Sequence, residues 1–226
     1  DVLLDYRAKQ DLPGAQAWLS ALFASHSETE LGDNILYEVA RIELEDRKRP
    51  AEAEVLLRRH QAAYPFSGLH DDVTFKLAVL LDEQSRFDEA LEVLEGLAGK
   101  QDEAWSVGSY DPKLRDDAML LRAEIFERTG RAQEAFDEYT RLLDTFPDYL
   151  GGSRIARDRL DLLREPLADR ARYMGALEDF LSAYPESVYV EDLRCRLVLA
   201  ARNVALEDIP GRAKEIKPCV WPEVAE

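Results

Sequence analysis

The chain has 226 residues, of which 46% are hydrophobic and 33% charged, so it has ample apolar material for a continuous core and does not resemble a disordered chain. It carries 29 Lys and Arg residues against 46 Asp and Glu residues, a formal net charge of −17. This balance disfavours binding to nucleic-acid backbones and anionic membranes and favours basic partners, with simple solubility as the alternative explanation. No run approaches the roughly 18 apolar residues of a membrane span, so we expect no direct membrane insertion.

The first residue is Asp1 rather than Met, which indicates either a processed mature protein or a piece of a longer chain. No signal peptide is visible to distinguish the two.

Apolar residues recur at positions i, i+3, i+4 and i+7 along most of the chain, which predicts an all-helical protein. Pro and Gly divide the pattern into segments, because both end helices and open turns. The predicted helices, in chain order, are 2–10, 14–25, 34–48, 51–63, 71–84, 87–98, 114–129, 132–145, 153–164, 168–183 and 187–204.

Most of these helices form consecutive pairs, and three aromatic-Pro steps mark where one pair ends and the next begins: Tyr64-Pro65, Phe146-Pro147 and Tyr184-Pro185. We therefore predict one helical array over 1–204, with its best repeats at 34–147. The remainder, 205–226, contains three Pro residues and is predicted to be an irregular tail.

Two stretches repeat the same spaced apolar and small residues, with Asp71 aligned on Asp116. The second stretch resembles the tetratricopeptide repeat family, whose unit of about 34 residues has small and large residues at set places. It supplies Met119, Ala123, Phe126, Gly130, Ala135, Tyr139 and Pro147. The resemblance implies an all-α, right-handed α-solenoid of helix-turn-helix repeats that acts as a non-enzymatic scaffold for protein-protein interaction.

Members of this family bind protein or peptide segments in a concave groove lined by the first helix of each pair. Carried over to this chain, the groove positions are Ile35, Glu38, Ile42, Glu45, Asp72, Phe75, Val79, Asp82, Asp117, Leu120, Glu124 and Glu127. These residues mix carboxylates with apolar side chains and lack the Lys, Arg and Asn of members that clamp a C-terminal carboxylate. We therefore expect a basic or amphipathic partner segment.

The junction phrases, such as Ala183-Tyr184-Pro185-Glu186-Ser187, are similar to those of bacterial envelope repeat proteins of the outer-membrane assembly lipoprotein and Tol-Pal coordinator types. This resemblance implies a periplasmic or outer-membrane-associated protein in cell-envelope assembly, with a cytoplasmic location as the alternative. A second reading is a structural fragment of a larger repeat protein that packs against other domains of the same chain.

Three further features lie outside the repeats. The insertion at 99–112 is expected to be a loop in which Trp105 and Tyr110 either anchor a partner or cover the core. The tail either folds back onto the array or links to a further region. The two cysteines, Cys195 and Cys219, either pair in an oxidising compartment or remain free thiols.

The chain shows no set of residues typical of an enzyme. Its three histidines lack a second His or Cys at ligand spacing, and no phosphate loop or nucleophile motif is present. His70-Asp71-Asp72 is the one cluster that could act as a base or metal site, but it also fits a plain helix start with Asp at the positive end. We expect no catalytic residue, no metal and no cofactor.

Overall fold

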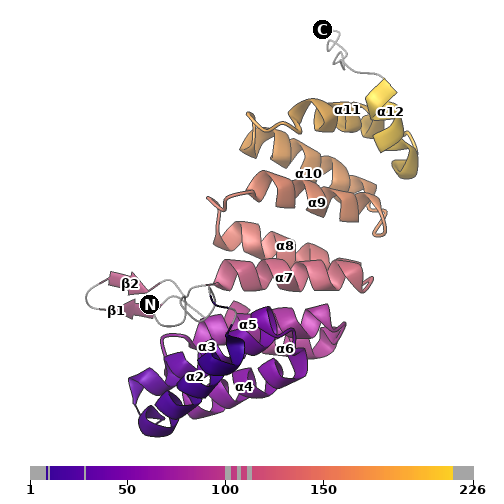
Figure 1. The fold of residues 1–226 in the computed structure, drawn as a ribbon. Coiled ribbons are helices and arrows are strands. Elements are labelled where there is room, and N and C mark those ends of the chain that lie inside the picture. The colour runs from indigo at the N-terminus through magenta and orange to yellow at the C-terminus, as the bar shows by residue number, and fades with distance from the viewer. Residues whose placement is uncertain are drawn as a thin grey trace. The chain divides into compact units, whose positions relative to one another are not determined.

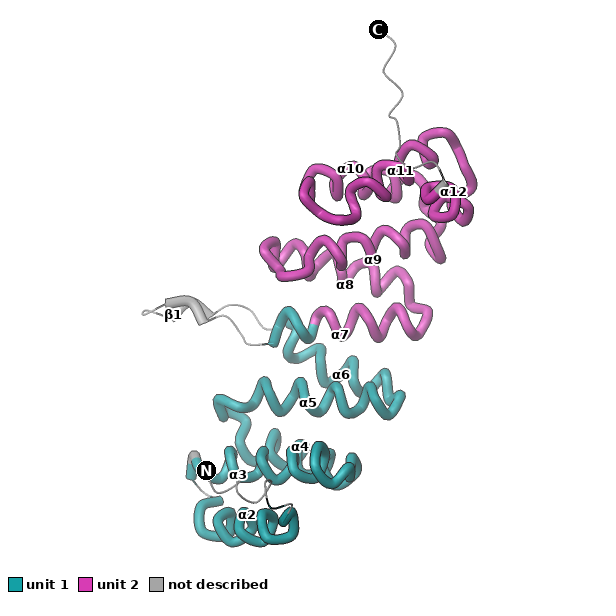
Figure 2. Tube along the Cα trace, turned by 45° about the horizontal axis from the view of Figure 1, so that its top comes forward, with its two compact units in different colours: residues 1–118 teal, residues 119–226 magenta. Residues whose placement is uncertain are grey.

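The computed structural model describes residues 9, 11–27, 29–99, 103–105, 108–110 and 114–215; the side chains of residues 30, 103–105, 108–110 and 215 are not described. The chain forms two compact units, Asp1–Ala118 and Met119–Glu226, coloured teal and magenta in Figure 2. No helix in the described part is long and apolar enough to cross a membrane.

Unit 1 consists of helices and one small hairpin. Its elements are α2 (Leu12–His26), α3 (Glu30–Arg41), the π-helical turn η1 (Ile42–Asp46), α4 (Pro50–Ala63), α5 (His70–Glu83), α6 (Phe87–Ala98), β1 (Glu103–Trp105) and β2 (Gly108–Tyr110). Helix α7 (Arg115–Arg128) begins in unit 1 and ends in unit 2.

Unit 2 continues with helices alone in its described part. These are α8 (Ala132–Thr145), α9 (Gly152–Arg164), α10 (Arg170–Ala183), α11 (Val190–Ala201), the short 3-10 turn η2 (Leu206–Asp208) and α12 (Ile209–Glu215). Within each unit, successive helices pack against one another, as α3, α4, α5 and α6 do in unit 1 and α8 to α12 do in unit 2 (Figure 1). The predicted class, an all-α solenoid of helix-turn-helix repeats, is confirmed.

The turns inside the helix pairs share one backbone conformation. One residue adopts a left-handed conformation there, with φ between 50° and 75°, in each of five turns: Lys48, Ser85, Gly130, Ala168 and Asn203. At three of these turns the next amide donates to the carbonyl five residues back; the N–O distance is 2.9 Å from Arg86 to Leu81. This bond satisfies a carbonyl that the end of a helix leaves open.

The turn between helix pairs is also repeated. After each aromatic-Pro step, an amide donates back to the carbonyl of the aromatic residue, at 3.1 Å from Ser67 to Tyr64 and 3.0 Å from Ser187 to Tyr184. At the two tyrosine steps, the aromatic side chain then reaches a glycine at the start of the same pair. A Cβ on Gly32 would lie 2.6 Å from the Tyr64 hydroxyl, and one on Gly152 would lie 3.2 Å from the Tyr184 hydroxyl.

The structure corrects the predicted start of the third helix. We predicted a start at residue 34, but α3 begins at Glu30 and includes Gly32 and Asp33. A glycine is needed at position 32 of this helix because the Tyr64 hydroxyl occupies the space that a side chain would fill. The end of this helix also differs, because the π-helical turn η1 carries one extra residue per turn and closes with the Arg47 amide on the Ile42 carbonyl at 2.9 Å.

The predicted irregular tail is also wrong in its first part. Residues 206–215 are helical, and Leu206, Ile209 and Ala213 are buried in the core of unit 2. Pro210 does not prevent this helix because it is the second residue, where the backbone amide has no helical partner. The start of the tail therefore folds back against α11, while 216–226 lie outside the described residues.

The insertion at 99–112 is not a plain loop. It contains an antiparallel hairpin in which Glu103 pairs with Tyr110 and Trp105 pairs with Gly108. Trp and Tyr favour extended backbone, which accounts for strands at this place in a helical chain.

Candidate functional site

The groove residues predicted in unit 1 lie on α3, η1 and α5. Those on α5 are all partly exposed, as expected for a lining surface: Asp72, Phe75, Val79 and Asp82. Ile42 is a correction, because it is only 1% exposed and belongs to the core that α2 forms with α3. Ile35 is buried in the same core and cannot line a surface either. Glu38 is partly exposed.

A hollow of about 480 Å³, here called the α5 hollow, lies where the predicted groove runs along α5. It is lined by Leu44, Glu45, Lys48, Pro50, Lys76, Val79, Leu80 and Glu83. Half of this lining is apolar and half is charged. It therefore offers an apolar contact surface surrounded by ionic groups, which suits an amphipathic chain segment.

The charges at the α5 hollow are balanced rather than acidic. Lys76 Nζ lies 2.9 Å from Glu45 Oε1, and Arg41 Nη2 lies 3.3 Å from Glu45 Oε2. Burial opposes ionisation of Glu45, but the hydrogen bonds from Lys76 and Arg41 outweigh it and hold the pKa of this carboxyl below its usual value. Arg41 also pairs with Glu38 at 2.8 Å, so two predicted acidic positions are already neutralised within the chain.

The remaining groove positions lie on α7. Asp117, in the first turn, is partly buried, and burial together with the neighbouring Asp116 raises the pKa of its carboxyl. Leu120 and Glu124 are partly exposed, and Glu127 is exposed. The Glu127 carboxylate accepts a 2.9 Å hydrogen bond from the Tyr139 hydroxyl of α8, which fixes one of its oxygens.

The other predicted site residues cannot all be located. Trp105 and Tyr110 lie in strands β1 and β2, but their side chains are outside the described residues. Cys195 is fully buried and is not a free thiol. Its predicted partner, Cys219, is outside the described residues, so the pairing stays a prediction.

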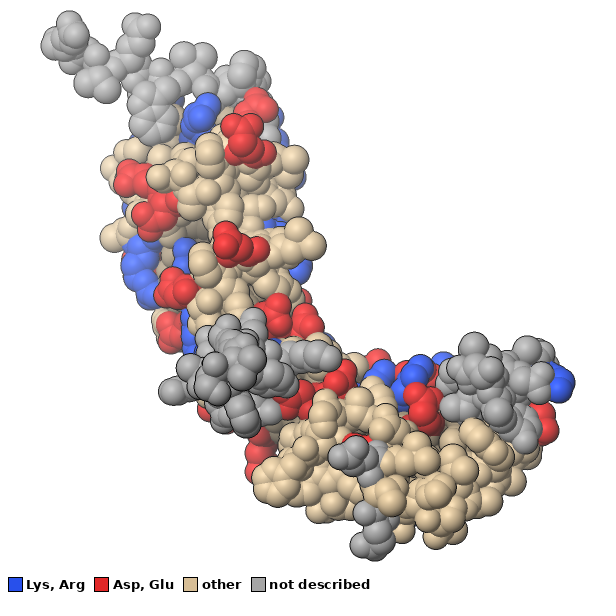
Figure 3. Space-filling model, turned by 90° about the vertical axis from the view of Figure 1, so that its left-hand side faces the viewer, with Lys and Arg blue, Asp and Glu red and all other residues tan. Residues whose placement is uncertain are grey.

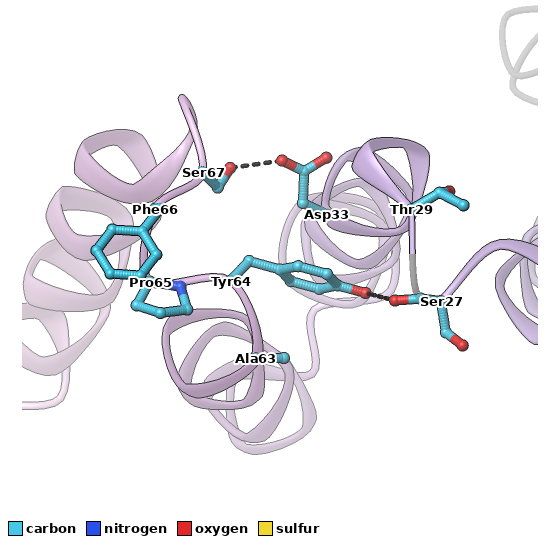
Figure 4. A pocket seen from close by; sticks show the side chains of 8 residues that line it. All are labelled: Ser27, Thr29, Asp33, Ala63, Tyr64, Pro65, Phe66 and Ser67. Atoms are coloured by element: carbon cyan, nitrogen blue, oxygen red, sulfur yellow. Dashed lines mark hydrogen bonds between the residues drawn. The ribbon is translucent and has the colours of Figure 1, made fainter.

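A second hollow, of about 450 Å³, lies at the first aromatic-Pro junction and is here called the junction pocket (Figure 4). It is lined by Ser27, Thr29, Asp33, Ala63, Tyr64, Pro65, Phe66 and Ser67. The Tyr64 hydroxyl donates to the Ser27 carbonyl at 2.6 Å, and the Ser67 hydroxyl donates to Asp33 Oδ2 at 2.5 Å. The first bond joins the end of α4 to the end of α2, and the second joins the turn after α4 to the start of α3.

Sequence reasoning missed the junction pocket, although a signal for it was present. The second residue after the aromatic position is Phe66 at the first junction, but Asp148 and Glu186 at the other two. A large apolar residue where the other copies carry an acid indicates a local role. Phe66 is 99% exposed, so that role is not packing within the chain.

Charged side chains are otherwise interspersed on the face that Figure 3 shows, with red and blue atoms adjacent rather than gathered by sign. In the described part of the chain, no group of three or more His, Cys, Asp or Glu side chains is placed to hold a metal ion.

Comparisons with known proteins agree with this geometry. A model of the tetratricopeptide repeat matches residues 117–149. Three solved structures illustrate the similarity of the fold. The first, a tetratricopeptide repeat protein from Parabacteroides merdae, is 18% identical at a TM-score of 0.56, and the match covers 80% of this chain and 64% of that one.

The second, a Podosopora anserina putative kinesin light chain with nearly identical TPR-like repeats, is 13% identical at a TM-score of 0.52, with 80% and 93% covered. The third, BtubC from P. vanneervenii, is 17% identical at a TM-score of 0.53, with 92% and 89% covered. A search of curated proteins found no match. The family model therefore supports a tetratricopeptide repeat at residues 117–149. The solved structures, at these low identities, support the fold alone.

Proposed function

We propose that the chain is a non-catalytic scaffold that binds an amphipathic segment of another protein in the α5 hollow. Tetratricopeptide repeat proteins are typically protein-binding scaffolds, which supports the general class. The observation that carries the proposal is the lining of this hollow, where Leu44, Pro50 and Val79 supply apolar contact and Lys48 and Glu83 stand among them. Apolar contact would provide affinity, and the charged groups would fix the orientation of the segment.

The expected partner segment carries a basic residue as well as apolar ones. The chain as a whole has a net charge of −17, which attracts basic segments over distance even though the α5 hollow is locally balanced. Binding should therefore weaken as salt is raised, mainly through slower association.

The proposal can be tested with a pull-down from source-cell extract using the whole chain, Val79→Lys and Val55→Lys. Val79 lines the hollow, whereas Val55 is 67% exposed on α4 and does not line it, so the two variants make the same chemical change at different places. We expect a partner that binds the unmodified chain and the Val55 variant, and binds the Val79 variant at least about tenfold more weakly, or about 1.4 kcal/mol.

A partner that both variants retain would move binding away from the α5 hollow. If no partner is found under any salt condition, the second reading, a fragment that packs against other domains of its own chain, would gain support.

We further propose that the protein acts in the assembly of the bacterial cell envelope, in the periplasm or at the outer membrane. This rests on the aromatic-Pro junction phrases alone. Protease treatment of intact and permeabilised source cells, followed by detection of the chain with an antibody, would test it. Protection in cells whose outer membrane alone is opened would place the protein in the cytoplasm and reject the envelope role.

A further inference from the structure

Asp33 is a nearly buried carboxylate that is held by hydrogen bonds from neutral groups. It is 9% exposed and accepts hydrogen bonds from neutral donors, the Ser67 hydroxyl and both the backbone and side-chain amides of Asn34. Within the described residues it forms no ion pair with Lys, Arg or His.

Phe66 lies on the outer edge of the same pocket, and Ser67 stands between it and the Asp33 carboxylate (Figure 4). Its ring lies next to Pro65 and away from the chain's own core (Figure 4). An aromatic side chain that is fully exposed to water contributes nothing to folding, but it offers a flat apolar contact and a negative ring face to a partner.

The matching position in unit 2 lacks both features. The Tyr184 ring contacts Gly152 as Tyr64 contacts Gly32, so the residue that corresponds to Asp33 is Ser153 and the one that corresponds to Phe66 is Glu186. The closing contact of a helix pair therefore forms without an acid at the position of Asp33 and without a ring at the position of Phe66. Those two side chains are not required by the fold of the junction.

We propose that the junction pocket binds a basic side chain, Lys or Arg, of a partner protein. The cationic head would pair with the Asp33 carboxylate, and the aliphatic stem would lie on the ring of Phe66 and beside Tyr64. A carboxylate next to aromatic rings is the combination that recognises such a side chain, through a charge-assisted hydrogen bond and cation–π attraction.

This site is separate from the α5 hollow. The two share no lining residue, and the junction pocket is formed by the ends of α2, α3 and α4 rather than along α5. A negative result at the junction pocket would therefore not count against binding at the α5 hollow, and the reverse also holds.

The test is an NMR titration of the whole ¹⁵N-labelled chain with a short peptide, acetylated and amidated at its ends, that carries one Arg between two Leu residues. We expect saturable shifts of the amides at 27–34 and 63–69. The same peptide with citrulline, the neutral analogue of Arg, should bind about tenfold more weakly. Equal binding of the two peptides, shifts elsewhere, or no saturable shift would overturn the proposal.

Three variants separate charge from structure. Asp33→Asn removes the charge but can still accept from Ser67, and we expect at least about tenfold weaker binding. Phe66→Ser should also weaken binding. Glu186→Gln removes an acid from the corresponding turn of unit 2 and should bind the peptide as the unmodified chain does. Unchanged binding by Asp33→Asn, or a comparable loss in Glu186→Gln, would reject recognition by the Asp33 charge.

Discussion

Gly32 and Gly175 show how the same residue type can be required at one position and replaceable at another. A Cβ on Gly32 would lie 2.6 Å from the Tyr64 hydroxyl and 2.7 Å from the carbonyl oxygen of His26, and a backbone oxygen cannot move aside cheaply. We expect Gly32→Ala to destabilise the protein by about 1–3 kcal/mol. A Cβ on Gly175, in α10, would meet no atom within 4 Å, so Gly175→Ala should stabilise it by about 0.5–1 kcal/mol. Urea unfolding of both variants measures these opposite signs.

His60 makes the stability of unit 1 depend on pH. Its ring is fully buried, packs against Tyr64 at 5.3 Å between centroids, and has no hydrogen-bond partner for either nitrogen in the described structure. Burial lowers the pKa of the imidazole, although the nearby Asp33 carboxylate opposes the shift. The unfolded chain therefore binds a proton at a higher pH than the folded chain does.

Stability should consequently be full above the usual histidine pKa of about 6.5 and fall as the pH drops below it. We expect His60→Phe, which keeps an aromatic ring but cannot titrate, to lose less stability than the unmodified chain between pH 7.5 and pH 5.5. Urea unfolding at the two pH values measures the difference. The same loss in both proteins would show that His60 is not responsible.

At the scale of an element, the turns inside helix pairs carry strain that can be removed. Ala168 has a left-handed φ of 50°, a conformation that costs a residue with a Cβ about 1–2 kcal/mol. Ala168→Gly removes that cost but adds freedom to the unfolded chain, so we expect a net stabilisation of about 0.5–1 kcal/mol by urea unfolding. Ala176→Gly, in the interior of α10, is the matched control and should destabilise instead.

The same turns explain which helices the sequence could predict. Helices α6 and α8 begin and end at the predicted residues, because each follows a left-handed turn residue and its apolar period is unbroken. The start of α3 was missed because Gly32-Asp33 has the composition of a turn, and only the distant Tyr64 shows why Gly belongs inside the helix. Helix α12 was missed because Pro210 was interpreted as a breaker when it stands at a helix start.

The groove was predicted in part, for a similar reason. Residues on α5 are exposed because the helical period places them there. The neutralisation of Glu38 and Glu45 by Arg41 follows from spacings of three and four residues and was open to prediction. The pair between Lys76 and Glu45, however, joins residues of different helices and does not follow from local sequence.

At the scale of the whole molecule, each unit has its own buried residues. Leu77 in α5 and Leu177 in α10 are both 0% exposed, so either Leu→Ala change should cost about 2–5 kcal/mol. In repeat proteins each helix pair contacts its neighbours only, so the loss should be largely local. We expect hydrogen exchange to accelerate mainly in α4–α6 for Leu77→Ala and mainly in α9–α11 for Leu177→Ala. Equal acceleration along the whole chain in either variant would contradict local stability.

The contact between the junction tyrosine and the glycine has a consequence for how such a chain can gain repeats in evolution. Tyr64 meets Gly32 and Tyr184 meets Gly152, so both halves of the contact belong to one helix pair in each case. A gene segment that encodes one pair therefore also encodes the contact that closes it. Duplication of that segment would add a helix pair that already contains its own tyrosine–glycine contact. A later exchange of Asp33 or Phe66 for another residue would change what one copy binds but leave the contact between Tyr64 and Gly32 in place.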